Sequence, residues 1–244
     1  MGLSTAASEA TAYYGMYAGV RNATWQLLLR VDIAALPVRC EEVAAGMGIP
    51  VLHYARAGPL LRALGLQGHC ENNDGFAAHI DGRWCVFLNG DAAALNRNFT
   101  LAHELGHIFL GHVMEETQAH GGERVRYTRL NRREWACGLD RTDAMEREAN
   151  MFAARMLSPA CALWGLDLRK SGEIARVCGL PVHVAQKRAE RMRVLYARNL
   201  FLKSPAEGML FRRLKPYLLS QRPEGRLPEH CLRKLEEIVT AKSH

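Results

Sequence analysis

The 244-residue sequence contains seven cysteines but no Cys-x-x-Cys pair. The cysteines stand at positions 40, 70, 85, 137, 161, 178 and 231, so they are scattered and odd in number. This pattern argues against a disulfide framework and against a cysteine-rich zinc site, and it is typical of free thiols in a reducing compartment. We therefore expect a cytoplasmic protein.

Long apolar runs are also missing. No stretch reaches the roughly 18 apolar residues that a membrane-spanning helix needs, and residues 1–15 lack the basic and apolar regions of a signal peptide. Internal repeats and low-complexity segments are absent from the sequence as well. Hydrophobic residues make up 48% of the chain and charged residues 23%, as in ordinary globular proteins. The composition predicts a protein with a packed core and no membrane segment.

Charge is distributed unevenly, although the formal net charge is only +7. From residue 160 onward the chain has 17 Lys and Arg against 8 Asp and Glu, whereas the first 159 residues have 15 against 17. A basic C-terminal part suggests an acidic partner or a weak contact with nucleic acid. A solvated helical surface is the simpler interpretation of such a charge run.

Hydrophobic periodicity and turn residues predict an alternating pattern of helices and a few strands. Helices are expected over residues 12–35, 40–48, 60–64, 93–112, 140–157, 205–220 and 228–241. A short strand is expected within 49–55, and a hairpin at 76–80 and 83–88 around the favoured turn Asp81-Gly82. Residues 113–139 are expected to form a loop, and 171–198 resemble a helix-turn-helix segment. We expect two domains, 1–160 and 161–244.

A His-Glu-x-x-His motif lies inside the otherwise apolar stretch 99–112, FTLAHELGHIFLGH. On a helix, His103 and His107 point to one side, about 40° apart, and can share a metal ion. Neutral imidazole suits Zn²⁺, and a catalytic zinc usually takes three protein ligands and leaves one position for water. Glu104 is then placed to take the proton of that water and to deliver it to a leaving amine. Gly106 lowers the helix propensity, and a residue without a side chain would let another segment approach closely.

The third ligand is sought on the helix expected at 140–157. Glu146 and Asn150 are four residues apart on one face. Glu146 would complete a His-His-Glu set, and Asn150 would orient a metal-binding histidine by a hydrogen bond. Glu148 is an alternative ligand that faces another side of the helix. Further alternatives, in the loop expected at 113–139, are Glu115, Glu116 and His120.

The two segments RNFTLAHELGHIFLGH (97–112) and MEREANMFAARMLSP (145–159), taken together, resemble the ImmA/IrrE family of zinc metallopeptidases. DGRWCVFLNGD (81–91) is similar to the hairpin of that family, and the likeness covers about residues 37–160 and extends more weakly to 218. The resemblance implies an α+β, gluzincin-like zincin fold with a small antiparallel sheet whose hairpin packs on the active-site helix. It implies Zn²⁺ bound by His103, His107 and Glu146, with Glu104 as general base and acid.

The resemblance also implies an intracellular protease that cuts a transcriptional repressor, of an anti-repressor, mobile-element or stress-response type. Many family members carry an N-terminal helix-turn-helix domain, but residues 1–36 are too short for one. We therefore expect a helix-turn-helix repressor on a separate chain as the substrate. Tyr127 and His120 are considered as donors to the oxyanion. The alternatives are a DNA- or regulator-binding module with a structural zinc, supported by the basic residues Lys187, Arg188, Arg191 and Arg193, and a toxin–antitoxin component.

Overall fold

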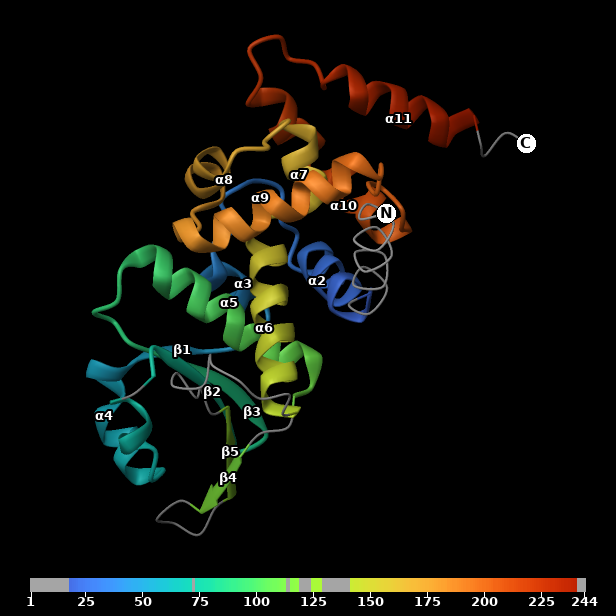
Figure 1. The fold of residues 1–244 in the computed structure, drawn as a ribbon. Helices are drawn as coiled ribbons and strands as arrows, with labels where there is room; N and C mark the ends of the chain where they lie inside the picture. The colour runs from blue at the N-terminus through green and yellow to red at the C-terminus, as the bar shows by residue number, and fades with distance from the viewer. Residues whose placement is uncertain (1–17, 72, 113–114, 119–123, 129–140, 241–244) are drawn as a thin grey trace, which may run out of the picture. The chain divides into compact units, whose positions relative to one another are not determined.

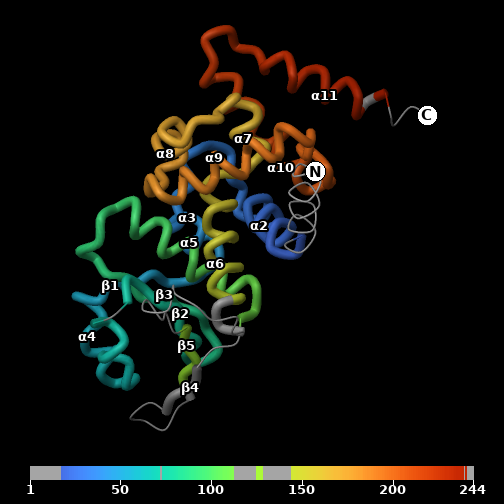
Figure 2. The backbone as a smooth tube through the Cα atoms, in the orientation of Figure 1, coloured from blue at the N-terminus to red at the C-terminus, as the bar shows by residue number. Residues whose placement is uncertain are grey.

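The computed structural model describes residues 18–71, 73–112, 115–118, 124–128 and 141–240 (Figures 1 and 2). The chain forms two compact units. One, the sheet unit, contains Gly19–Ala23 and Arg39–Ala154, and the other, the helical unit, contains Thr24–Val38 and the residues from Arg155 onward. Residues 24–38 thus belong with the C-terminal helices, so the two units interleave along the chain. The division into contiguous domains 1–160 and 161–244 stays a prediction.

The sheet unit contains a five-stranded sheet with the strand order β1-β3-β2-β5-β4. The strands are β1 Val51–His53, β2 Gly75–Ile80, β3 Arg83–Leu88, β4 Glu115–Gln118 and β5 Arg124–Tyr127. The expected hairpin is present as β2 and β3, which pair antiparallel around Asp81 and Gly82. Both turn residues have a positive φ, 48° and 77°, which is the backbone conformation that this turn requires.

Two expectations about the sheet are wrong. The sheet is mixed instead of antiparallel, because β1 runs parallel to β3. The direction of β1 could not be predicted from the sequence. The strand has only three residues, and its partner β3 is separated from it by a helix and by β2. The second error concerns residues 113–139, where a loop was expected and the structure has the hairpin β4–β5. The sequences EETQ and RVRY are short and polar, so they lack the apolar alternation that signals a strand.

The helices of the sheet unit cover both faces of the sheet. They are α3 Cys40–Gly46, α4 Tyr54–Ala63, the 3-10 turn η1 Gln67–His69, α5 Ala94–Leu110, and most of α6 Arg141–Leu157. Helix α5 packs on β2 and β3. The contact is close at Gly75, where a β-carbon would lie 2.6 Å from Leu88 and 2.7 Å from the methyl group of Thr100. A glycine is therefore required where the strand meets the helix.

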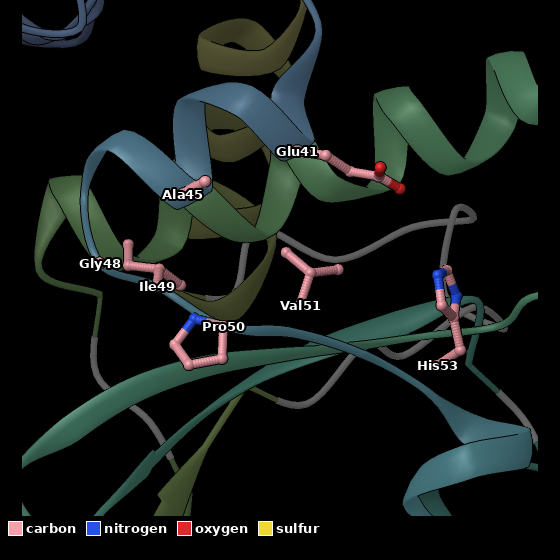
Figure 3. A pocket seen from close by; sticks show the side chains of 7 residues that line it. All are labelled: Glu41, Ala45, Gly48, Ile49, Pro50, Val51 and His53. Atoms are coloured by element: carbon pink, nitrogen blue, oxygen red, sulfur yellow. The ribbon is translucent and has the colours of Figure 1, made fainter.

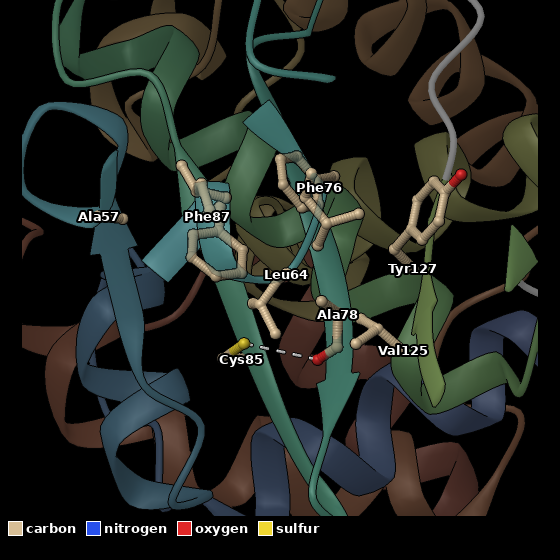
Figure 4. Packing of buried hydrophobic residues seen from close by; sticks show 10 residues of the cluster. Ala57, Leu64, Phe76, Ala78, Cys85, Phe87, Val125 and Tyr127 are labelled. Atoms are coloured by element: carbon tan, nitrogen blue, oxygen red, sulfur yellow. Dashed lines mark hydrogen bonds between the residues drawn. The ribbon is translucent and has the colours of Figure 1, made fainter. Parts of the chain in front are cut away.

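The opposite face of the sheet carries a hydrophobic cluster (Figure 4). Alternate residues of three neighbouring strands point into it, as the two-residue period of a strand dictates. Phe76 and Phe87 stack with a centroid distance of 5.1 Å. The cluster consists of Ala57, Leu61, Leu64, Leu66, Phe76, Ala78, Cys85, Phe87, Val125 and Tyr127. The sheet is thus packed on both faces, with this cluster on one and α5 on the other.

The helical unit contains α2 Ala18–Arg30, except for its residues Gly19–Ala23, which belong to the sheet unit. Its other helices are α7 Ala160–Gly165, α8 Ser171–Cys178, α9 Val182–Ala197, α10 Pro205–Ser220 and α11 Glu229–Thr240. Helices α8 and α9 pack on each other around Gly179, which has a positive φ of 62°. In the described part of the chain, none of the helices has both the length and the apolar character required to cross a bilayer.

Candidate metal centre

The His-Glu-x-x-His motif lies in the most buried part of α5. Its helix is covered by the sheet and by neighbouring helices, so every residue from Leu101 to His107 is buried. The side chains of His103 and His107 are each about 5% exposed, and Glu104 is fully buried. Polar side chains buried to this extent need partners, because an unpaired buried polar group costs free energy. Their partners come from α6, from the sheet and from the C-terminal end of α5.

Helix α6 brings Glu146 to the two histidines. Its Oε2 lies 3.1 Å from Nε2 of His103 and its Oε1 lies 3.3 Å from Nε2 of His107. The two Nε2 atoms are 3.0 Å from each other. The three residues thus place one ligand atom each within 4.8 Å of the others. The predicted set His103, His107 and Glu146 is brought together in space.

The approach of α6 to α5 depends on Gly106. A β-carbon at Gly106 would lie 3.2 Å from the side chain of Phe152 and 3.3 Å from Cα of Ala149. Phe109 and Phe152 stack beside this contact with nearly parallel rings. In Figure 1, α6 passes beside α5 in the sheet unit. The glycine therefore allows the close contact that the sequence suggested, and α6 is the segment that makes it.

The arrangement of the three side chains fits a tetrahedral metal ion. Ligand atoms on a zinc ion with bonds of about 2.1 Å are roughly 3.4 Å apart in tetrahedral geometry. The two Nε2 atoms are 3.0 Å apart, and each of them lies 3.1 to 3.3 Å from one of the two carboxylate oxygens of Glu146, which is close to that value. Two imidazole nitrogens that face each other need a proton or a cation between them, since both otherwise present lone pairs. The donor set of two imidazoles and one carboxylate matches the ligands that zinc takes in catalytic sites.

The electrostatics of the cluster follow from this geometry. Burial raises the pKa of Glu146, but the hydrogen bonds and charges of His103 and His107 lower it to about 2. Burial lowers the pKa of His103, but the hydrogen bond to Glu146 and the charges of Glu104 and Glu146 raise it above its ordinary value. The carboxylate of Glu146 is thus held ionised beside the imidazole of His103, whose affinity for a proton is raised, as is expected of a site that attracts a cation.

Glu104 points from the same helix into the sheet. Its Oε2 accepts a 3.0 Å hydrogen bond from the backbone N–H of Ala77 and a 2.7 Å hydrogen bond from the hydroxyl of Thr128. Its Oε1 has no hydrogen-bond partner among the described residues, although it is buried. Burial raises the pKa of Glu104, while His103, His107 and Thr128 act in the opposite direction. One carboxylate oxygen is therefore anchored and the other is free to accept a proton.

Two further side chains, those of Asn150 and His112, contact the Nδ1 atoms of His103 and His107. Oδ1 of Asn150 lies 3.2 Å from Nδ1 of His103, in the place that we expected for Asn150. Nδ1 of His112 lies 2.9 Å from Nδ1 of His107, and Nε2 of His112 lies 3.1 Å from Oε2 of Glu148. Glu148, the alternative metal ligand, therefore contacts His112 and is absent from the three-residue cluster.

Thr128 and His112 are the residues whose contacts the sequence did not reveal. Thr128 follows β5, a strand that was not predicted, and its amide donates to the carbonyl of Ala77. His112 lies outside the His-Glu-x-x-His motif, so the motif did not point to it. Its position just after Gly111 is the sequence signal that could have placed it, because a glycine there reverses the chain at a helix end.

The remaining residues that the sequence singled out are not part of the metal-binding cluster of the described residues. Tyr127 is buried in the hydrophobic cluster, where its ring lies 4.4 Å from that of His69. His120 and the side chains of Glu115 and Glu116 lie outside the described residues. Arg188, one of the four basic residues of α9, is buried and donates two hydrogen bonds to the carbonyl of Ser158.

A cavity of about 490 Å³ lies beside β1, away from these groups (Figure 3). It is lined by Glu41, Ala45, Gly48, Ile49, Pro50, Val51 and His53. In Figure 3, Glu41 approaches it from α3 and His53 from the end of β1. None of its lining residues belongs to the cluster of His103, His107 and Glu146.

Comparison with known proteins finds a matching family model. Residues 57–190, more than half of the chain, match the model of the IrrE N-terminal-like domain, a peptidase family. The matched segment begins in α4 and ends in α9, so it includes α5, α6 and every residue of the cluster. No curated protein matches the sequence.

Proposed function

Because this chain belongs to the IrrE N-terminal-like family of peptidases, we propose that it is a zinc-dependent endopeptidase. The observation that carries the proposal is the convergence of His103, His107 and Glu146 within 4.8 Å, with the buried Glu104 following His103 in the same helix. A metal-binding set beside a buried, half-anchored carboxylate is the arrangement that metal-assisted hydrolysis of a peptide bond needs.

In this proposal His103, His107 and Glu146 hold the ion. Zinc, when bound, supplies a Lewis acid and lowers the pKa of water toward about 7. Asn150 keeps His103 in the orientation that directs its Nε2 toward the ion, because its Oδ1 accepts a hydrogen bond from Nδ1 of that ring.

Glu104 carries the proton transfers. The amide of Ala77 and the hydroxyl of Thr128 occupy Oε2, so Oε1 is the atom that accepts the proton of the attacking water. The same atom returns the proton to the amine that leaves when the peptide bond breaks. Burial favours this role, since it raises the pKa of the carboxyl group and so brings the group nearer to the pH at which proton transfer in both directions is efficient.

We further propose that the substrate is a cytoplasmic transcriptional repressor with a helix-turn-helix, carried on a separate chain. Support comes from the likeness of segments 97–112 and 145–159 to the ImmA/IrrE family.

The test compares the wild type with Glu104→Gln at equal zinc content. Each is incubated with a mixture of small DNA-binding proteins from the source cells, and new N-termini are identified by mass spectrometry. We expect cleavage products with the wild type, and none with the variant or after removal of the metal by a chelator. Equal cleavage by Glu104→Gln would overturn the proposed mechanism. Absence of cleavage of any protein or peptide by the zinc-loaded wild type would overturn the enzymatic function.

A DNA-binding role for α8 and α9 is the second candidate. It is favoured by the two packed helices around Gly179 and by the exposed Lys187 and Arg193 on α9. The buried Arg188 weakens it, because that guanidinium is already bonded to Ser158. A salt titration separates the two roles. Binding to DNA should weaken steeply with salt and be unchanged in Glu104→Gln.

A further inference from the structure

The end of α5 has a backbone geometry that places His112 over the last turn of the helix. Gly111 adopts the left-handed conformation with φ of 66°. The amide of His112 donates to the carbonyl of His107 at 3.1 Å, and the amide of Gly111 donates to the carbonyl of Ile108. These two bonds define a Schellman motif, in which the side chains corresponding to His107 and His112 characteristically touch. The contact between the two rings is therefore set by the backbone.

The contact between the rings is a hydrogen bond, and it continues to a carboxylate. Nδ1 of His107 and Nδ1 of His112 are 2.9 Å apart, and Nε2 of His112 is 3.1 Å from Oε2 of Glu148. The side chain of His112 is 6% exposed, whereas that of Glu148 is 38% exposed. The chain of contacts thus runs from solvent, through Glu148 and His112, to the buried His107.

One assignment of protons satisfies every hydrogen bond in the series from His107 through His112 to Glu148. The Nε2 atom of His107 faces His103 and Glu146, so a metal there requires Nε2 without a proton and Nδ1 with one. Nδ1 of His107 then donates to Nδ1 of His112. His112 must in turn carry its proton on Nε2, from which it donates to Oε2 of Glu148. The metal at one end and the carboxylate at the other therefore require the same direction for both hydrogen bonds.

We propose that His112 and Glu148 are positioning residues that hold His107 in its metal-binding tautomer and orientation. This proposal rests on the proposed metal site, and it assigns to Glu148 a role other than that of a ligand. Asn150 does the same for His103 with a neutral amide. The support of His107 differs because the hydrogen bonds through His112 end at the carboxylate of Glu148. Such a partner makes the imidazole of His107 a stronger metal ligand.

The test measures zinc affinity by competition with a chelator, so that it requires no substrate. Loss of such a supporting partner typically weakens metal binding by about 10- to 100-fold. We expect a loss in this range for His112→Ala and a smaller loss for Glu148→Ala. The double variant should be no weaker than His112→Ala, because Glu148 acts only through His112. Arg147→Ala, at an exposed neighbouring position of α6, is the matched control and should bind zinc as the wild type does.

A second pair of variants tests the backbone origin of the contact. Gly111→Ala strains a residue with positive φ, and no neighbour lies within 4 Å of the added β-carbon. Gly48→Ala imposes the same strain after α3, where nothing lies within 4 Å of the added β-carbon and Ile49 donates to the carbonyl of Ala44 in the same pattern. Both should lower stability similarly, but only Gly111→Ala should weaken zinc binding. This comparison separates a positioning role from a general loss of folding.

Nitrogen NMR of the zinc-loaded protein gives a readout that a purely structural role would not affect. We expect His112 to be protonated at Nε2 and unprotonated at Nδ1, and His107 to be protonated at Nδ1. Wild-type zinc affinity in both His112→Ala and Glu148→Ala would overturn the positioning role alone. The opposite tautomer of His112 would also overturn it. A wild type that binds no divalent metal would overturn both this inference and the proposed function.

Discussion

The hydroxyl of Thr128 donates a 2.7 Å hydrogen bond to Oε2 of Glu104, although the two residues are 24 positions apart in the sequence. The amide of Ala77 lies within hydrogen-bond distance of both groups, at 2.7 Å from Oγ1 of Thr128 and 3.0 Å from Oε2 of Glu104. The carboxylate that the proposed mechanism uses is thus fixed by the sheet and not by its own helix. This arrangement leads to the first prediction.

Thr128→Val should lower kcat by about 10- to 100-fold, because a hydrogen bond to a charged group contributes roughly 1.5–3 kcal/mol. Valine keeps the shape of threonine but leaves Oε2 of Glu104 with only the amide of Ala77. Thr128→Ser retains a hydroxyl and should keep most of the activity. Zinc content should be unchanged in both, since Thr128 is not part of the metal-binding cluster. Full activity of the valine variant would show that the hydroxyl does not position Glu104.

Glu146→Ala should lose most of the bound zinc, whereas Glu148→Ala should retain about one zinc per chain at saturating metal. The reason is that Glu146 contributes a ligand atom to the cluster, while Glu148 contacts His112. Elemental mass spectrometry of the two variants and the wild type, purified in parallel, measures the difference. Zinc lost from the Glu148 variant and kept by the Glu146 variant would reverse the assignment of the third ligand.

Gly106→Ala should not show the gain in stability that alanine normally brings to a helix. Its β-carbon would lie 3.3 Å from Cα of Ala149, a backbone atom that does not move aside easily. Gly208→Ala in α10 is the control, because nothing lies within 4 Å of its added β-carbon. We expect Gly208→Ala to raise the free energy of unfolding by up to about 1 kcal/mol, and Gly106→Ala to be at least about 1 kcal/mol less favourable. Urea titrations measure both, and equal gains would contradict the close packing of α5 on α6.

Zinc affinity should fall as the pH is lowered, and the fall should begin above pH 6.5. The pKa of His103 is raised above its ordinary value of 6.5 in the metal-free protein, so protons already compete with the metal near neutral pH. Each displaced proton changes the apparent affinity by about tenfold per pH unit. Chelator competition between about pH 8 and pH 6 measures this slope. An affinity that stays constant over the range would show that His103 does not exchange its proton for the metal.

Much of the sheet unit could be predicted because its signals are local. The hairpin β2–β3 was predicted from Asp81-Gly82 and its apolar flanks, and α5 and α6 from their helical period. The strands β4 and β5 could not be predicted, because they are short and polar and are stabilised by pairing with each other and with β2. The parallel direction of β1 depends likewise on a partner that lies far along the chain.

The sequence by itself determined that His103 and His107 share a helix face, and that Glu146 and Asn150 share another. These are consequences of the helical period, which relates residues only a few positions apart. The tertiary structure decided that Glu146 approaches the histidines and Glu148 does not, that Thr128 reaches Glu104, and that His112 contacts His107. Such contacts depend on how closely α6 approaches α5 and on how the chain reverses at the end of α5. Here Gly106 allows that approach and Gly111 allows that reversal. Both glycines are visible in the sequence, but the segments and side chains that they bring together are not.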